Sequence, residues 1–479
     1  MDTHALSRMA RHIAGIVVMM TGTVIATSPI QAQSPVEATG GPVASTSPAR
    51  PLTAAEIERR LYIFWRGFLP TLTDDGRVAP RDSVQAILLP RAHQWLAELK
   101  KNTKMSSMQR DPYAALLAGM GETGDAQREF EARLATKGLS TEERGYTLYI
   151  ASTVFAGPET PEALAIARKY LAQLDALPGD VATWKYSAHV AMANAYYDLG
   201  KTADAIAQFE QAFAAIPQIP FEDRIKIVDD AFVTYAVLVA GQPNGRAKID
   251  ATGKRFLAFL TPSASLVARD SNFLQLGRNY QMFMQYKITQ VSRLGEAAPA
   301  IVANHWFNVA APSAAPQGVD SVPADARALR LDDGTIRLLE FGEYGCHACV
   351  EALPVMDELR DSVPPGVQVW YVTKTEGSWG ITQCTPAEEA AHLRTFYVDN
   401  EHRRLPIAVW AGPRDVAIDD GSTPRQSPNV KAYGISSTPT FVLIDGHGIV
   451  RHLEVGLSSD AMSRIKKRIA YLVAEANHA

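Results

Sequence analysis

The residues with the clearest chemical potential are two cysteines in the segment Cys346-His347-Ala348-Cys349. They follow an apolar, strand-like stretch that ends at Phe341, and a helix-like pattern begins with them. Thiols at this spacing can form a disulfide with each other. At a helix N-terminus, unpaired N–H groups and the helix dipole favour a thiolate. We therefore predict that Cys346 attacks as the thiolate and that Cys349, one turn into the helix, resolves the mixed disulfide.

The chain has only three cysteines, too few for a scaffold held together by disulfides. We interpret the third, Cys384, as an ordinary buried thiol; the alternative is a third redox thiol that traps an intermediate. A zinc site is the competing interpretation of the pair, but zinc needs about four ligands, and only Cys384 and His392 could complete the set. No metal is therefore predicted. Glu343 is interpreted as a surface charge.

Length and charge limit the classes of protein to consider. A chain of 479 residues has room for two or three domains. Its formal net charge of -4 and its isoelectric point near 6.3 do not indicate a basic domain or stripe. Since nucleic-acid proteins usually carry such a stripe, no nucleic-acid partner is expected.

The segment 1–32 has the pattern of a secretory signal peptide. Arg8 and Arg11 precede an apolar run over residues 13–26, and small residues lead to a cleavage site after Ala32. The alternative is an uncleaved N-terminal anchor. Export would place the mature protein in an oxidising compartment, the periplasm, where a Cys-x-x-Cys pair has directional chemistry.

Residues 33–51 are rich in Pro, Ser, Thr, Gly and Ala and predict a flexible linker. From 52 to 309 the apolar spacing is helical almost throughout. Small and aromatic residues there match a tetratricopeptide repeat, in which small residues let two helices approach and Gly turns the chain. The matching positions are Ala193, Tyr196, Gly200, Ala205, Phe209 and Pro217, with an echo at Gly121, Ala126 and Phe130. An irregular helical bundle is the alternative; either fold offers a groove for a peptide or partner protein.

A second linker is predicted at 310–323, and an α/β domain over 324–479. In the latter, the pattern predicts two strands around the turn at 332–334, then alternating helices and strands, a hairpin around 445–448 and a closing helix. The predicted strands are 326–331, 336–341, 367–373, 407–410, 440–444 and 449–455; the predicted helices are 347–363, 386–396, 429–433 and 459–474. The predicted fold class is thus an α-helical, tetratricopeptide-like domain followed by an α/β domain.

This C-terminal part resembles the thioredoxin fold at four positions. They are the cysteine pair, Pro354 five residues after Cys349, the dipeptide Thr438-Pro439, and Glu340 six residues before Cys346. The resemblance implies a cis proline at Pro439 that faces the disulfide and exposes backbone to a bound peptide. It also implies that Glu340 is a buried acid that exchanges a proton with Cys349. His347 would favour the thiolate when protonated.

The insertion over 373–430 resembles the TlpA and ResA group, which implies a reductant of protein disulfides supplied by a membrane electron donor. Gly345 departs from that group, which usually has Trp there, and the segment from Glu340 to Cys349 also resembles DsbA-like proteins, which implies an oxidase or isomerase. We predict an exported thiol-disulfide oxidoreductase, the reductant being preferred, whose only redox group is the disulfide. The hypothesis from another class is a helical scaffold with a redox-inactive thioredoxin-like binding module.

Overall fold

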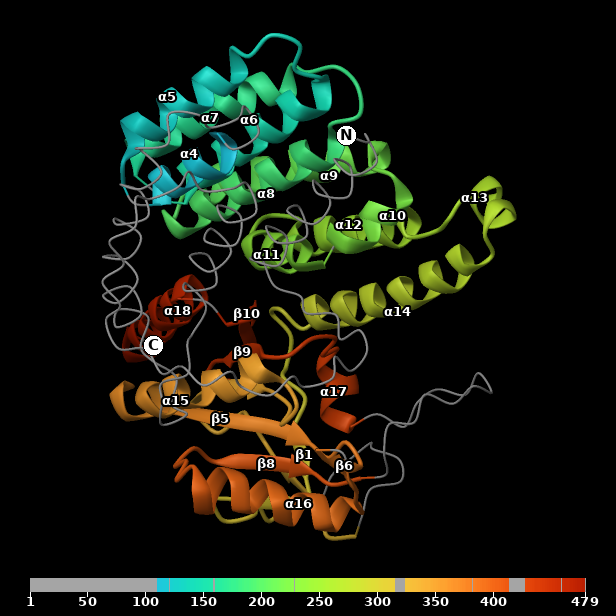
Figure 1. Ribbon diagram of the computed structural model, residues 1–479. Coiled ribbons are helices and arrows are strands. Elements are labelled where there is room, and N and C mark those ends of the chain that lie inside the picture. The colour runs from blue at the N-terminus through green and yellow to red at the C-terminus, as the bar shows by residue number, and fades with distance from the viewer. Residues whose placement is uncertain are drawn as a thin grey trace, which may run out of the picture. The chain divides into compact units, whose positions relative to one another are not determined.

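The computed structural model describes residues 110–119, 121–157, 160–227, 229–314, 324–380, 382–412, 427–457 and 459–478 (Figure 1). The predicted signal peptide with its cleavage site at Ala32, the linker at 33–51 and the first part of the helical region lie outside the described residues. The linker predicted at 310–323 is described only as far as residue 314. The predicted domain limits therefore stay a prediction.

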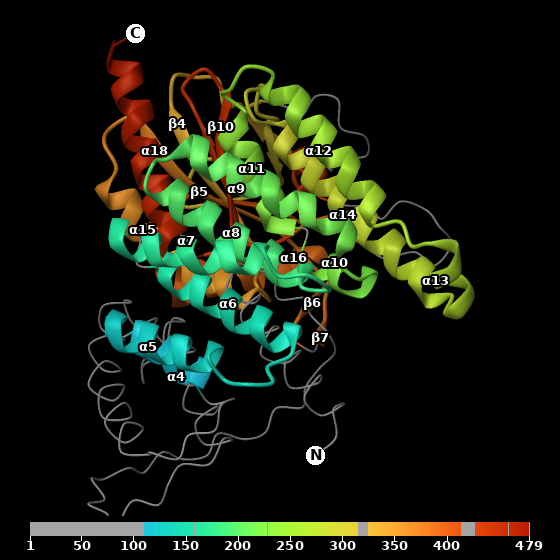
Figure 2. The ribbon, with the colours of Figure 1, turned by 90° about the horizontal axis from the view of Figure 1, so that it is seen from above.

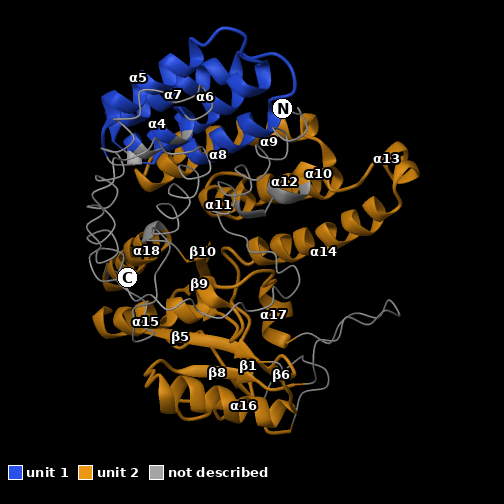
Figure 3. Ribbon diagram, viewed as in Figure 1, with its two compact units in different colours: residues 1–192 blue, residues 193–479 orange. Residues whose placement is uncertain are grey.

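Contacts divide the chain into two compact units, 1–192 and 193–479 (Figure 3). The described part of the first unit is helical. Its helices are α4 (Arg110–Gly119), α5 (Thr123–Leu134), α6 (Thr141–Ala156), α7 (Pro161–Asp175) and the beginning of α8 (Ala182–Asp198). Two of these helices begin at capping residues that the sequence supplies: the side-chain oxygens of Ser140 and Thr160 cap the first turns of α6 and α7.

The core of the first unit is built on aromatic side chains at the predicted repeat positions. Gly121 has a positive φ of 80° at the turn before α5, and Ala126 and Phe130 on α5 are fully buried. Phe130 packs edge-on against Phe155 of α6 and Tyr170 of α7, with ring centroids 6.0 and 6.1 Å away. The motif thus occupies the helix turn and the core, while the tetratricopeptide assignment itself stays a prediction.

The second unit begins with helices. They are α9 (Thr202–Ala215), the short 3₁₀ turn η3 (Ile216–Gln218), α10 (Phe221–Ile227), α11 (Asp229–Val239), α12 (Gly245–Phe259), α13 (Ala264–Arg269) and α14 (Asn272–Ser292). The motif recurs here: Gly200 has a φ of 72°, and Ala205 and Phe209 of α9 are fully buried.

A six-stranded mixed sheet forms the rest of the second unit, in the order β10-β9-β4-β5-β8-β2. Its strands are β2 (His305–Phe307), β4 (Ile336–Phe341), β5 (Val367–Lys374), β8 (Ile407–Trp410), β9 (Thr440–Ile444) and β10 (Val450–Val455). β4 lies between β5, which is parallel to it, and β9, which is antiparallel. The strand that leads to the cysteine pair is therefore an interior strand of the sheet, held from both sides.

Helices cover both faces of this sheet. One face carries α15 (His347–Ser362), α16 (Pro386–Arg394) and α18 (Ser459–His478), whose apolar side chains share one core with Leu338, Tyr371 and Phe441. Figures 1 and 2 both show α15 beside α18. The other face carries α17 (Pro428–Tyr433), where the Tyr433 ring lies 4.9 Å from that of Phe341.

The structure differs from the predicted secondary structure in three details. Residues 301–307, predicted as helical, form β1 (Ile301–Ala303) and β2, which are too short for a period of two to show in the sequence. The strand predicted at 326–331 is present as the shorter β3 (Arg327–Leu329), which pairs with β1; both edges of β4 are occupied by β5 and β9. The helix predicted to end at 396 leaves α geometry after Arg394 and continues as a π-helix, η4 (Thr395–Asn400).

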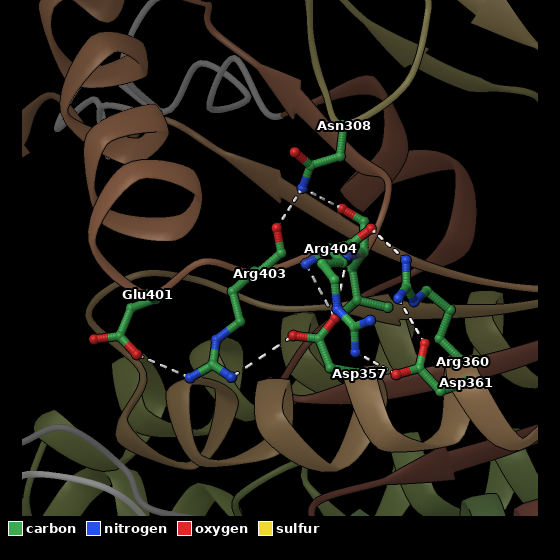
Figure 4. Close-up of polar contacts among 8 residues, drawn as sticks. Asn308, Asp357, Arg360, Asp361, Glu401, Arg403 and Arg404 are labelled. Atoms are coloured by element: carbon green, nitrogen blue, oxygen red, sulfur yellow. Dashed lines mark hydrogen bonds and ion pairs between the residues drawn. The ribbon is translucent and has the colours of Figure 1, made fainter.

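A polar network fastens the loop between η4 and β8 to α15 (Figure 4). The Asp357 carboxylate accepts hydrogen bonds from the backbone nitrogens of Arg404 and Leu405, at 3.2 and 3.1 Å. From the opposite side, the Asn308 amide donates to the carbonyl oxygens of Arg403 and Leu405, at 2.7 and 2.9 Å. The inserted segment is thereby held against the helix that begins with the cysteine pair.

Candidate active site

The two cysteines lie where β4 gives way to α15. Cys346 is the N-cap of the helix and forms a disulfide with Cys349, with 5.3 Å between their Cα atoms. The Cys346 sulfur accepts a hydrogen bond from the Cys349 nitrogen at 3.2 Å. Cys346 is partly exposed, whereas Cys349 is fully buried. The arrangement therefore offers one accessible sulfur at a helix N-terminus and one protected sulfur behind it.

A loop from the other end of the domain faces this disulfide. The peptide bond between Thr438 and Pro439 is cis, and the Thr438 carbonyl oxygen lies 3.5 Å from the Cys346 sulfur. Pro439 leads directly into β9, the antiparallel neighbour of β4. The pairing of these two strands is what brings residues 92 positions apart into contact.

Glu340 lies within the sheet on the face that α15 covers. It is fully buried on β4, in register with Tyr371 of β5 and Phe441 of β9. Neither carboxyl oxygen has a hydrogen-bond partner among the described residues, and burial raises its pKa well above the usual value. Such a carboxyl stays protonated to higher pH than an exposed one, and it is a stronger base once ionised.

Two buried tyrosines lie next to this acid. The Tyr371 and Tyr397 hydroxyls are 3.3 Å apart, and burial raises the pKa of both. The Tyr371 ring lies against the backbone at Gly342, where a Cβ atom would approach its ring and hydroxyl to 2.6 Å. Glycine at 342 therefore leaves the space in which this tyrosine reaches toward the segment between Glu340 and Cys346.

His347 points along the helix to a carboxylate. Its Nε2 atom lies 2.9 Å from Glu351, one turn further along α15. The His347 side chain is 71% exposed and that of Glu351 only 7%, and burial raises the pKa of Glu351. The imidazole between the cysteines thus has an acidic partner, and its charge is partly balanced when it is protonated.

More carboxylates surround the loop before Cys346. Glu343 forms an ion pair with Lys374 at 3.5 Å, and burial and Glu343 together raise the pKa of Glu376 to about 7. The Glu376 carboxylate lies beside Gly345, 3.7 Å from the position of a Cβ atom there. The Glu389 carboxylate accepts hydrogen bonds from the backbone nitrogens of Glu376 and Gly377, at 2.7 and 2.6 Å, and so holds the backbone at these two residues in place. The neighbourhood of the accessible cysteine is therefore acidic.

The inserted segment packs onto the same loop through aromatic rings. Tyr344 stacks on Trp379 with 3.9 Å between centroids and meets Phe396 edge-on at 5.2 Å. Trp379 belongs to the small hairpin of β6 (Ser378–Trp379) and β7 (Thr382–Gln383). Trp370 is buried on β5.

Cys384 follows this hairpin, and its backbone nitrogen donates to the Gly377 carbonyl oxygen at 3.2 Å. It is a free, partly exposed cysteine whose pKa is raised by desolvation and by Glu389 and Glu388. A raised pKa opposes the thiolate form that exchange chemistry needs. In the described part of the chain, no three His, Cys, Asp or Glu side chains are grouped so as to hold a metal ion.

Sequence reasoning missed several residues around the disulfide. Glu351 stands four residues after His347, a spacing that places both on one helix face and could have indicated the pair. Tyr371, Tyr397, Glu376 and Glu389 gave no such signal, because strand pairing and the inserted segment bring them to the site.

No protein-family model and no curated protein match this chain. Solved structures do. A thioredoxin-like superfamily protein is 23% identical, with 37% of this chain and 95% of that chain covered and a TM-score of 0.24. An exposed lipoprotein thioredoxin from Streptococcus pneumoniae is 21% identical, with 31% and 94% covered and a TM-score of 0.23. A putative thiol:disulfide interchange protein DsbE from Chlorobium tepidum is 19% identical, with 37% and 97% covered and a TM-score of 0.25.

The predicted thioredoxin fold is confirmed. The disulfide at the start of the helix after β4, and the cis proline just before the hairpin of β9 and β10, are the arrangement that the sequence resemblance implied. The titles of these structures name a thioredoxin and a putative thiol:disulfide interchange protein. None of the helices in the described ranges is long and apolar enough to cross a membrane.

Proposed function

We propose that this protein is an exported thiol-disulfide oxidoreductase that reduces disulfides in protein substrates through Cys346 and Cys349. The observation that carries the proposal is the position of the Cys346 sulfur. It caps a helix N-terminus, lies 3.5 Å from the carbonyl of the cis-proline loop, and has the buried Cys349 behind it. A peptide that pairs with the loop backbone would present its own disulfide to Cys346.

The exchange proceeds in two steps, starting from the dithiol form. The Cys346 thiolate attacks one sulfur of the substrate disulfide; a mixed disulfide forms, and the other substrate sulfur leaves as a thiolate that takes up a proton. The Cys349 thiolate then attacks the Cys346 sulfur, which closes the disulfide seen here and releases the second substrate thiolate. Two electrons pass to the substrate, and an external dithiol must restore the pair.

Glu340 supplies the base for the second step. Cys349 is fully buried and must lose its proton before it can attack, and Glu340 is a buried carboxyl on the sheet face that α15 covers. An ionised carboxylate with a raised pKa is a strong acceptor for that proton, and its protonated form returns the proton when the disulfide opens.

The charges around Cys346 favour a reductant. An oxidant of this type depends on a stabilised thiolate, because a stable reduced form makes the disulfide more oxidising. Here the Glu351 carboxylate balances His347, and the Glu376 carboxyl lies beside Gly345. Negative charge near a thiol disfavours the thiolate, which lowers the oxidising power of the pair.

The remaining assignments complete the proposal. The disulfide is the only redox group, with no metal or organic cofactor. The mature protein acts in the periplasm after cleavage at Ala32, or anchored if the leader is retained, and receives electrons from a membrane donor. Its helical region binds the partner protein or peptide that brings the substrate.

The reduction potential of the pair tests this proposal. It is measured by equilibrating the mature protein with glutathione buffers, beside a Cys384→Ser variant as control. We expect a value close to that of thioredoxin, about -270 mV, unchanged in the control. A value near -120 mV would reverse the direction and mark a DsbA-like oxidant. A wild-type protein that forms no reversible disulfide would leave the scaffold hypothesis.

A further inference from the structure

The helix α14 packs against the cis-proline loop, although about 150 residues separate them in the sequence. Gly434, which begins the loop after α17, has a φ of 67°. A Cβ atom at this position would lie 2.5 Å from the Tyr286 carbonyl oxygen and 2.5 Å from the Gln290 nitrogen. Only glycine permits an approach this close, so the loop rests directly on the backbone of α14.

Side chains of α14 and of the segment after it hold the same region. Arg293 donates to the Ala432 carbonyl oxygen at 2.8 Å, and the Tyr433 hydroxyl donates to the Pro299 carbonyl oxygen at 2.5 Å. α14 and its continuation are therefore joined to α17, the helix that leads into the loop (Figure 1).

One contact reaches the loop itself. Lys287 of α14 is 1% exposed, and its Nζ atom donates a hydrogen bond to the Ser437 hydroxyl at 3.0 Å. Ser437 directly precedes Thr438, whose carbonyl oxygen lies 3.5 Å from the Cys346 sulfur. A single peptide unit thus separates the residue that Lys287 holds from the group that faces the disulfide.

A buried lysine at this place is costly for stability, because an ammonium group loses its hydration when it is buried. The neighbouring polar groups add to the cost. Gln290, three residues further along α14, is fully buried, and neither polar atom of its side chain has a partner among the described residues. Well-packed apolar residues in place of a buried charge are often as stabilising or more so, so stability alone does not account for the lysine.

We propose that Lys287 is a positioning residue that holds the cis-proline loop in the geometry that binds the substrate peptide, so that α14 is part of the redox site. The inference rests on the proposed function, since it assumes that an extended peptide pairs with this loop beside Cys346. The hydrogen bond restrains Ser437 and, through it, the backbone of Thr438. Without it, the loop would sample more conformations, and a peptide would bind at the cost of ordering it.

A double-mutant cycle tests the proposal. The variants are Lys287→Met, Ser437→Ala and both together, with Lys287→Gln as a conservative variant that can still donate. The probe is a short synthetic peptide closed by one disulfide, reduced under steady-state conditions with a dithiol as electron donor. Lys248→Met serves as a control, because Lys248 is an exposed residue of α12 that contacts Glu210.

We expect Lys287→Met and Ser437→Ala each to raise KM for the peptide three- to tenfold while kcat changes less than twofold. The double variant should resemble either single variant, because both remove the same bond. Lys287→Gln should restore most of the affinity, and Lys248→Met should match the wild type.

The opposite result is also clear. If Lys287→Met and Ser437→Ala lower the melting temperature but leave KM unchanged, Lys287 is only structural and the inference is wrong. If Lys287→Met fails to fold, KM of Ser437→Ala decides alone. Failure of the proposed function would show earlier, as a wild-type pair that forms no reversible disulfide with glutathione. A wild type that reduces the peptide, together with variants whose KM is unchanged, would overturn this inference alone.

Discussion

Two buried glutamates in one sheet have opposite surroundings. Glu340 on β4 has no hydrogen-bond partner among the described residues, and burial raises its pKa. Burial would also raise the pKa of Glu454 on β10, but hydrogen bonds from His452 and Arg464 outweigh it and lower the pKa to about 2. Both carboxyls are removed from water, and only the second has the partners that compensate for this.

The surroundings of Glu454 are a closed network. Arg464 of α18 holds both of its oxygens, at 3.1 and 2.7 Å, and also binds Asp198 at 2.6 Å. His452 lies 3.3 Å from the same carboxylate. The network joins the end of α8 to the sheet edge and to the last helix. Glu454 is therefore a structural charge, whereas Glu340, for which the described part of the chain offers no partner that fixes its ionisation state, is free to exchange a proton.

The largest effect on stability is expected when the Glu454 carboxylate loses the Arg464 guanidinium. Arg464→Met leaves Glu454 and Asp198 without their guanidinium, so the free energy of unfolding should fall by about 3 to 5 kcal/mol. Urea titration followed by circular dichroism measures it. Lys467→Met, at an exposed position of the same helix, should change it by less than about 0.5 kcal/mol. A loss no larger than that of the control would mean that the network adds nothing.

The pH dependence of stability should differ in sign between the two glutamates. Glu454 has a pKa of about 2 in the fold and 4.5 as its reference, so its contribution is present above about pH 4.5 and is lost as the pH falls toward 2. The loss amounts to about 3 kcal/mol. The contribution of Glu340, whose pKa is raised, is present below about pH 4.5 and is lost as the pH rises through its folded pKa.

Urea titrations of the wild type, Glu454→Gln and Glu340→Gln across this range test the contrast. The stability difference between the wild type and Glu454→Gln should shrink on acidification, and the difference for Glu340→Gln should move in favour of the variant as the pH rises. Curves that stay parallel would show that neither carboxyl has a shifted pKa.

The rate of disulfide exchange should depend on Glu340 and not on Glu454, whereas stability depends mainly on the Glu454 network. Glu340→Gln removes the base proposed for Cys349, so the rate of disulfide exchange should fall by about a hundredfold at neutral pH. The free energy of unfolding should stay the same or rise slightly, because the variant buries no unpartnered carboxylate. Glu454→Gln should keep the exchange rate within a factor of two. Equal rates in both variants would remove the proposed role of Glu340.

The sequence could not have shown this difference between the two glutamates. Each follows a leucine in an apolar strand, as Leu339-Glu340 and Leu453-Glu454. What distinguishes them is Arg464, which belongs to a helix that comes later in the chain. Only the three-dimensional packing brings it to one of the two acids.

Other features of the fold and of the site could be predicted from the sequence, because local patterns determine them. Six strands of the α/β region were predicted to within a few residues, because buried runs end at turns such as that around Gly448, which has a positive φ of 76°. The two-residue strands β6 and β7 were missed, because they are too short to show a pattern. The cysteine pair and Thr438-Pro439 were found because their spacing is local. Lys287 was missed because its partner lies 150 residues away and no pattern marks the pair.

The smallest effect concerns Glu351, which stands between the two extremes. Its side chain is as buried as that of Glu454, but the charged group that it contacts among the described residues is the 71%-exposed His347, which water also reaches. Glu351→Gln should therefore change the free energy of unfolding by less than about 1 kcal/mol. The disulfide should respond more clearly, because a charged imidazole without its counter-charge stabilises the Cys346 thiolate.

The equilibrium with glutathione should shift about two- to fivefold toward the dithiol in this variant, when measured at a pH at which imidazole is charged. Adding His347→Ala should cancel the shift, because no cation then remains to be unmasked. A shift that persists in the double variant would mean that Glu351 acts on Cys346 directly. The buried carboxyl would then influence the thiol as Glu376 does, by its own charge, and His347 would have no part in setting the potential.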